Sequence, residues 1–150
     1  LHKAAMGYAK LCDPGQFSPD RLLACRKITA AMTSHPFMVG GPDRFDTRIM
    51  EVGGDKIISK VGAEGYQAIG LLTDALRPGS PALGIAIKIA DGDIANRARS
   101  IVALEVLRQL GAFTPDQLSQ LSEYDFKPIV NSRSIEVGEI RPYFALDIKI

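Results

Sequence analysis

The sequence predicts an α+β fold in which helices pack on an antiparallel sheet. Apolar residues recur near helical spacing in the first third of the chain. Three short runs rich in Ile, Val and Leu follow, separated by turns that contain Gly or Pro, and a further helical pattern comes after them. Strands in a row followed by helices favour α+β over an alternating βαβ order. The 150 residues suit a single domain.

The helices expected before the strands have clear ends. The first covers residues 1–11 and stops before Pro14, because proline cannot continue a helix. The second covers residues 18–34, with a serine N-cap and a first-turn proline at its start. An irregular connection over 38–42 and a short helix over 43–51 should follow.

The strands are expected to form a β-meander covered by a long helix. The expected strands are residues 56–60, 66–72 and 83–89. A largely buried helix over 94–110, capped by Asp91 to Asp93, should pack across the sheet. Residues 114–117 fit a capping box for a further short helix. Residues 129–130 and 144–150 are expected to add edge strands.

Composition argues against several classes of partner. The formal net charge is +1 and the basic residues are scattered, so no footprint for nucleic acid is present. Apolar runs such as 101–104 are much shorter than the about 20 residues that cross a bilayer, so no membrane partner is expected. Cys12 and Cys25 form no Cys-x-x-Cys pair, which argues against a zinc finger and favours the cytoplasm.

The triplet Lys60-Val61-Gly62 is the first candidate for chemistry. It lies at the end of a predicted strand and resembles the Lys-Thr-Gly element of serine acyl-transfer enzymes. An ammonium there can stabilise developing negative charge, and Gly62 lets a substrate approach the backbone closely. A solvated edge-strand lysine beside a turn glycine is the alternative.

Other polar residues are candidates for either a structural or a functional role. His35 precedes a proline and is better explained as a helix C-terminal residue than as a catalytic group. Arg44 and Asp46 form either an ion-paired helix surface or a polar cluster that orients a substrate. Glu64 is either a solvated turn carboxylate or a partner for Lys60 or a substrate ammonium. Asp91 is read as part of a helix cap, since no calcium loop follows it.

A complete nucleophile site is absent from the sequence. No Ser is followed three residues later by Lys, and no Gly-x-Ser-x-Gly or His-Glu-x-x-His is present. Gly40-Gly41 is followed by Pro42, so a glycine-rich phosphate loop is also excluded.

Several ordered blocks together resemble the thermolabile, rhizobial-type L-asparaginase II family. The blocks are His35-Pro36-x-Met38-Val39-x-Gly41 with Arg44-x-Asp46-Thr47, Lys60-x-Gly62-Ala63-Glu64-Gly65, Lys88-Ile89-x-Asp91-Gly92 and Val137-Gly138-x-Ile140-Arg141-Pro142. The resemblance covers nearly the whole chain and runs off its N-terminal edge. The chain begins at Leu1 within a helical pattern and without Met, so we expect it to be the C-terminal half of a larger asparaginase.

The resemblance implies the C-terminal part of a fold similar to serine β-lactamases and glutaminases. It also implies hydrolysis of L-asparagine through a serine acyl-enzyme, and a bound zinc. The family's Ser-x-x-Lys, Cys-Ser-Gly-Lys-His and Gly-Cys-Gly elements have no match here, so the serine and the zinc ligands would precede Leu1. Cys12 and Cys25 therefore do not inherit the zinc role, and the isolated chain should be inactive without its N-terminal half.

By position, the resemblance makes Lys60 the catalytic residue. Gly62, Glu64, Arg44 and Asp46 are the implied substrate-binding residues. Two alternatives stay open: a non-catalytic ligand-binding or assembly domain on the same scaffold, and a related glutaminase or penicillin-recognising acylase. A half fold would also leave an apolar sheet face uncovered, so self-association, in the simplest form a homodimer, is expected.

Overall fold

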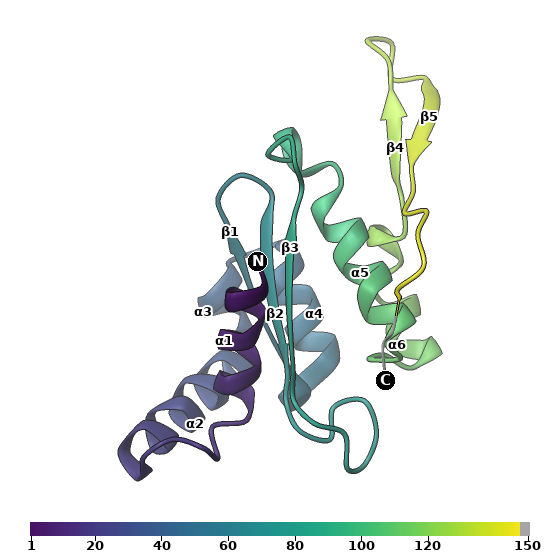
Figure 1. Cartoon of the computed structure of the whole chain (residues 1–150). Helices are drawn as coiled ribbons and strands as arrows, with labels where there is room; N and C mark the ends of the chain where they lie inside the picture. Colours follow the sequence, from purple (N-terminus) through teal and green to yellow (C-terminus); the bar gives the residue numbers. More distant parts are fainter. Residues whose placement is uncertain (148–150) are drawn as a thin grey trace.

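A three-stranded antiparallel sheet forms the centre of the structure, a computed structural model that describes residues 1–147 (Figure 1). The strands, in spatial order, are β1 (Ile57–Gly62), β2 (Tyr66–Leu71) and β3 (Leu83–Lys88). The registers pair Lys60 with Ala68 and Gly70 with Gly84. The predicted α+β class and β-meander are confirmed, with strand ends that differ by one or two residues.

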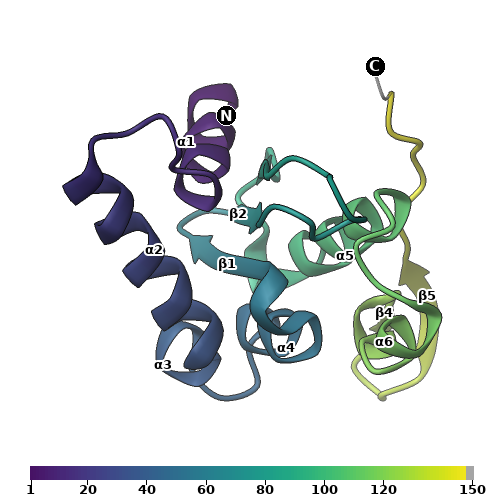
Figure 2. The ribbon, with the colours of Figure 1, turned by 90° about the horizontal axis from the view of Figure 1, so that it is seen from below.

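Helices cover both faces of this sheet. Helix α1 (His2–Cys12) lies across β2 and β3 on one face, while α4 (Phe45–Gly53) and α5 (Arg99–Gln109) lie on the other (Figure 2). Helices α2 (Pro19–Ser34) and α3 (Pro36–Gly40) run beside β1. The strand β1 is therefore an edge strand, and the elements that lead into α4 lie along its side.

Small residues let α1 approach its face of the sheet closely. Ala68 and Gly70 on β2 stand opposite Ala86 and Gly84 on β3, so four small side chains share one face. A Cβ at Gly84 would collide with the carbonyl oxygen of Ala5 in α1. The helix backbone thus rests almost directly on the strands.

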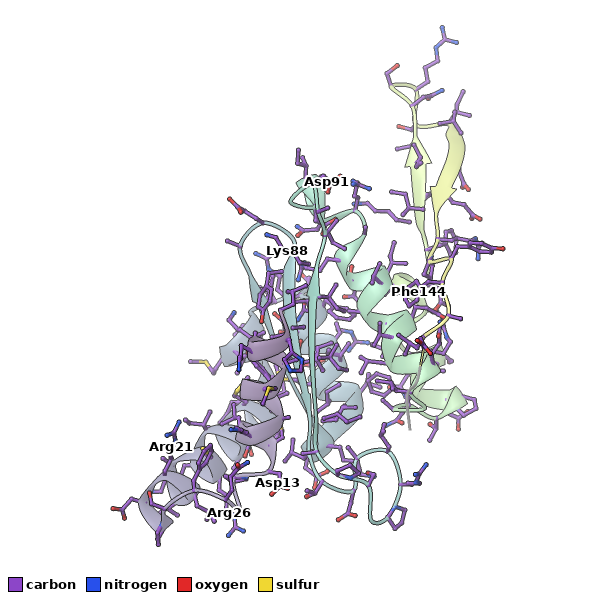
Figure 3. The ribbon with its side chains drawn as sticks, in the orientation of Figure 1. Asp13, Arg21, Arg26, Lys88, Asp91 and Phe144 are labelled. Carbon is purple, nitrogen blue, oxygen red and sulfur yellow. The ribbon has the colours of Figure 1, made fainter. Side chains whose placement is uncertain are left out.

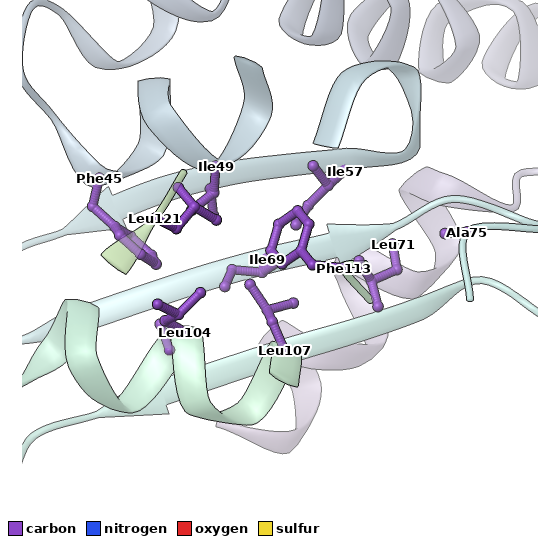
Figure 4. Packing of buried hydrophobic residues seen from close by; sticks show 11 residues of the cluster. Phe45, Ile49, Ile57, Ile69, Leu71, Ala75, Leu104, Leu107, Phe113 and Leu121 are labelled. Atoms are coloured by element: carbon purple, nitrogen blue, oxygen red, sulfur yellow. The ribbon is translucent and has the colours of Figure 1, made fainter. Parts of the chain in front are cut away.

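Large apolar residues fill the opposite face. They come from α4, β1, β2, α5 and the segment after α5, and they include Ile49, Ile57, Ile69, Leu104, Leu107, Phe113 and Leu121 (Figure 4). Five of these seven side chains have no measurable exposure. Alternation along β1 and β2 separates this packed face from the small-residue face, as an antiparallel sheet buried on both sides requires.

The structure corrects two expectations about where helices begin. Residues 38–42 were expected to be irregular, but residues 36–40 form the helix α3, because Pro36 is tolerated in a first helical turn. The helix expected over 94–110 begins only at Arg99. Asp93, Ala95 and Asn96 have φ values of 55°, 62° and 51°, so the backbone turns left-handed before α5 starts.

The end of the chain forms a separate hairpin. Strands β4 (Lys127–Val130) and β5 (Glu136–Ile140) pair with each other and not with the central sheet (Figure 1). Residues 129–130 are therefore in a strand, but not one at the edge of the main sheet. Residues 144–147 form no strand, and the rest of the strand expected over 144–150 lies outside the described residues.

The remaining elements are short. They are α6 (Pro115–Ser119) and 3-10 turns at Gly54–Lys56, Ile94–Asn96 and Ser122–Tyr124. The predicted capping box is confirmed, since Thr114 Oγ1 accepts from the Gln117 amide and the Gln117 side chain accepts from the Thr114 amide. Within residues 1–147, no helix combines the length and hydrophobicity needed to cross a bilayer.

The close approach of α1 leads to a first prediction. Gly84→Ala should lower the free energy of unfolding by about 3 kcal/mol, because the added methyl group meets backbone that cannot rotate away. Gly7→Ala is the matched control: it adds the same group within α1, where nothing lies within 4 Å, and should be neutral or stabilising by up to about 1 kcal/mol. Urea denaturation followed by circular dichroism measures both, and equal midpoints would contradict the packing described.

Candidate functional site

Lys60 projects from the edge strand β1 on the face that Ile58 and Gly62 share. The residue is exposed, and its Nζ donates a hydrogen bond to the Val39 carbonyl oxygen at 3.2 Å. Within residues 1–147, no carboxylate forms an ion pair with this ammonium. Its charge is therefore fixed in place by α3 but not neutralised.

The segment that holds Lys60 is itself tied to α4. Thr47 Oγ1 donates to the Gly41 carbonyl at 2.7 Å, and the Pro36 carbonyl lies 3.4 Å from the same oxygen. A Cβ at Gly40 would collide with the Thr47 hydroxyl, so glycine is required for this approach. Sequence blocks that are separated along the chain, around His35 to Gly41, Thr47 and Lys60, thus meet beside β1.

Asp46 secures β1 from the other face of the sheet. Its Oδ1 accepts from Ser59 Oγ at 2.5 Å and from Gln67 Nε2 at 2.7 Å, and its Oδ2 accepts from the Val61 amide at 2.8 Å. The residue lies in the first turn of α4 and is 1% exposed. Its acidic side chain suits the positive end of a helix.

A buried polar chain continues from Asp46 to α5. Gln67 Oε1 accepts from Arg99 Nη1 at 2.6 Å. The Arg99 guanidinium lies 3.8 Å from the Asp93 carboxylate, and this carboxylate accepts from the amides of Ala98 and Arg99 and so caps α5. Both side chains of the ion pair are at most 8% exposed.

Sequence reasoning missed Ser59, Gln67 and Arg99, although a signal existed. Gln67 alternates with Ile69 and Leu71 on β2, so a strict period of two already assigns it to the packed face. Arg99 lies four and eight residues before Ala103 and Leu107, on the buried side of α5. Polar residues at such inward positions predict a buried network, because buried polar groups need partners.

Gly62 and Glu64 lie at the turn between β1 and β2. Glu64 adopts a φ of 56°, and its carboxylate is 3.8 Å from Lys88 Nζ, which also donates to the Glu64 carbonyl. Lys88 and Asp91 lie at this same end of the sheet (Figure 3). Glu64 therefore pairs with Lys88 and not with Lys60, and its side chain is 84% exposed.

The other candidates occupy the surface or loop positions. Arg44 is exposed at the N-cap of α4. His35 is exposed and ends α2, as its helix-terminal interpretation predicted. Asp91 accepts from the Asp93 amide and pairs with Arg97, and the amide hydrogen bond is the main cause that lowers the pKa of its carboxyl. Asp91 therefore does not cap α5, contrary to expectation, and the carboxylate that accepts from the amides at the start of this helix is that of Asp93.

The residues described here do not fit a zinc site. No group of three or more His, Cys, Asp or Glu side chains in residues 1–147 is placed to hold a metal ion. Cys12 and Cys25 are both buried and free. Cys12 packs so closely on β2 that a Cβ at Gly70 would meet its sulfur, and burial raises the pKa of its thiol to about 12. Cys12 is a core residue.

This pKa leads to a second prediction. At pH 8, Cys12 should resist iodoacetamide in the folded chain and react in urea, because only the thiolate is nucleophilic. The shift is upward from 9.0, so the stabilisation from the neutral buried thiol is complete below pH 9 and decreases as the pH rises toward 12. An exposed thiol introduced by Ser132→Cys serves as the positive control. Mass spectrometry that shows Cys12 and the thiol introduced at position 132 modified equally in the folded state would contradict the burial of Cys12.

Comparison with protein-family models assigns this chain to a family. A comparison with curated proteins finds no match to this chain. The family model described as L-asparaginase II matches residues 1–142, which is nearly the whole of the chain. The chain therefore belongs to the L-asparaginase II family, a family of amidohydrolases.

Proposed function

We propose that this chain forms part of an L-asparaginase, in which Lys60 stabilises the charge that develops during acyl transfer. The observation that carries the proposal is the Lys60 ammonium itself. It stands at an exposed position of an edge strand, is held by a single carbonyl, and has no carboxylate partner within residues 1–147. An ammonium that is oriented but not neutralised is suited to an anionic transition state.

The reaction would proceed by nucleophilic catalysis. A serine hydroxyl attacks the side-chain amide carbonyl of asparagine, and the carbonyl oxygen becomes negatively charged. Ammonia leaves, and water hydrolyses the resulting ester to aspartate. A nearby ammonium lowers the barrier at both addition steps, since it interacts more strongly with the charged intermediate than with the neutral amide.

The serine would come from protein outside these 150 residues. No Ser-x-x-Lys motif occurs among them, and Ser59 beside Lys60 is buried and bound to Asp46. Two exposed apolar side chains precede Val39, whose carbonyl accepts from Lys60, and they support a partner segment at this place: Phe37 is 58% exposed and Met38 is 81% exposed. Such a segment would cover this surface and bring its hydroxyl to the ammonium.

A third prediction tests the role of Lys60. In the protein that includes the serine-bearing segment, Lys60→Ala should lower kcat for asparagine by at least about 100-fold, as expected for loss of a transition-state charge partner. The midpoint of unfolding should hardly change, because the side chain is exposed.

Lys56→Ala is the matched control for this variant, since Lys56 is an exposed lysine just before the same strand. It should retain normal turnover. If Lys60→Ala keeps the parental kcat, the chain is a non-catalytic domain and the proposal fails.

A fourth prediction concerns the division of the site. The 150-residue chain alone should release no measurable ammonia from asparagine, because it contributes the cation without the nucleophile. The protein with the serine-bearing segment should hydrolyse asparagine faster than glutamine or a β-lactam. Ammonia release by the isolated chain would contradict the divided site, and preference for glutamine or a β-lactam would assign a related acylase instead.

A further inference from the structure

The buried polar chain on the packed face of the sheet has an unusual distribution of charge. The Asp46 carboxylate meets only neutral donors: a hydroxyl, a side-chain amide and a backbone amide. The cation of this hydrogen-bonded network, Arg99, lies on the far side of Gln67 from Asp46 and pairs with Asp93. The Gln67 side chain therefore links the two charged centres, with its NH₂ turned toward Asp46 and its oxygen toward Arg99.

Such a network is not the simplest way to stabilise a core. Taking charges out of water is costly, and apolar residues of similar volume would often stabilise the fold as well or better. Ile57, Ile69 and Leu104 fill the adjoining core without any polar group. A reason other than stability is needed for a carboxylate, an amide and a guanidinium in this layer.

The contacts between the buried polar network and β1 supply that reason. Asp46 holds the side chain of Ser59 and the backbone amide of Val61, which are the two neighbours of Lys60. The side chains of Ser59 and Val61 face α4, whereas that of Lys60 faces the opposite side of the sheet. The Asp46 carboxylate therefore binds β1 at the two residues that flank the lysine. On the opposite face, the Val39 carbonyl receives the ammonium.

We propose that Asp46, Gln67 and Arg99 form a positioning relay that sets the location of the Lys60 ammonium for catalysis. This inference rests on the proposed function of Lys60. None of the three residues touches a substrate, because each is at most 7% exposed. The relay transmits the placement of α5 and α4 to β1, and it holds the ammonium where charge develops in the transition state.

A double-mutant cycle in the protein that includes the serine-bearing segment tests the relay. Asp46→Asn leaves the volume unchanged but replaces an acceptor by a donor next to three donors. It should lower kcat about 10-fold or more and leave KM within twofold. In a Lys60→Ala background the same substitution should cause no further loss, since the relay acts only through that amine.

Leu107→Ala is the structural control, because it opens a cavity in the same core without touching the relay. It should lower the unfolding midpoint but leave kcat per folded molecule unchanged in both backgrounds. An Asp46→Asn loss of equal size with and without Lys60 would show a general structural role and overturn the relay. If Lys60→Ala instead left kcat unchanged, the proposed function would fail, and the relay would fail with it.

Gln67→Glu supplies a pH readout that a purely structural role would not give. The introduced carboxyl faces Asp46 and Ser59 on one side and Arg99, backed by Asp93, on the other. When protonated it donates to Asp46 and accepts from Arg99, as the native amide does. Burial and the Asp46 carboxylate favour the protonated form of the introduced carboxyl, whereas Arg99 favours its ionised form, so kcat relative to the parental protein should be highest at low pH and fall as the introduced carboxyl ionises. A variant whose kcat follows the parental pH profile at every pH would count against the relay.

Discussion

The hydrogen bonds to the Asp46 carboxylate join three elements of the fold. They connect the first turn of α4 with β1 and, through Gln67, with β2. Because an edge strand lacks a neighbour on one side, its position depends on such contacts more than that of a central strand does. The Val61 amide, which would otherwise be an unpaired group of this edge, is satisfied by a helix side chain. The location of Lys60 follows from the same contact.

The two faces of the sheet are built differently, and the difference matters for the site. On one face, glycine and alanine residues bring the backbone of α1 onto β2 and β3. On the other, large apolar side chains from α4 and α5 form a packed core, with the polar network at its margin. Strand β1 is held by α4 on the packed face and is bordered by α2 and α3, so it can present a charged side chain at a defined place, because close-packed interiors resist displacement.

The blocks that relate this chain to the L-asparaginase II family also have separate physical tasks. The segment ending at Gly41 offers carbonyl groups, and Thr47 and Lys60 donate to them. The turn after β1 carries Glu64, which pairs with Lys88 from β3, while Asp93 caps α5 and pairs with Arg99. Residues remote in sequence are thereby assembled at one end and one edge of a small sheet.

The sequence by itself determined the elements whose signals are local. Periodicity, prolines and caps predicted α1, α2, α4, the three strands and the capping box at Thr114, since these patterns depend on neighbours within a few residues. The motif blocks also identified the family and drew attention to Lys60.

The tertiary structure alone decided which candidates meet. It placed Asp46 in the core, paired Glu64 with Lys88, and separated the hairpin of β4 and β5 from the main sheet. It also revealed the link from Gln67 to Arg99, whose residues lie 32 positions apart. Contacts of this kind depend on how helices and strands pack, and no local pattern carries that information.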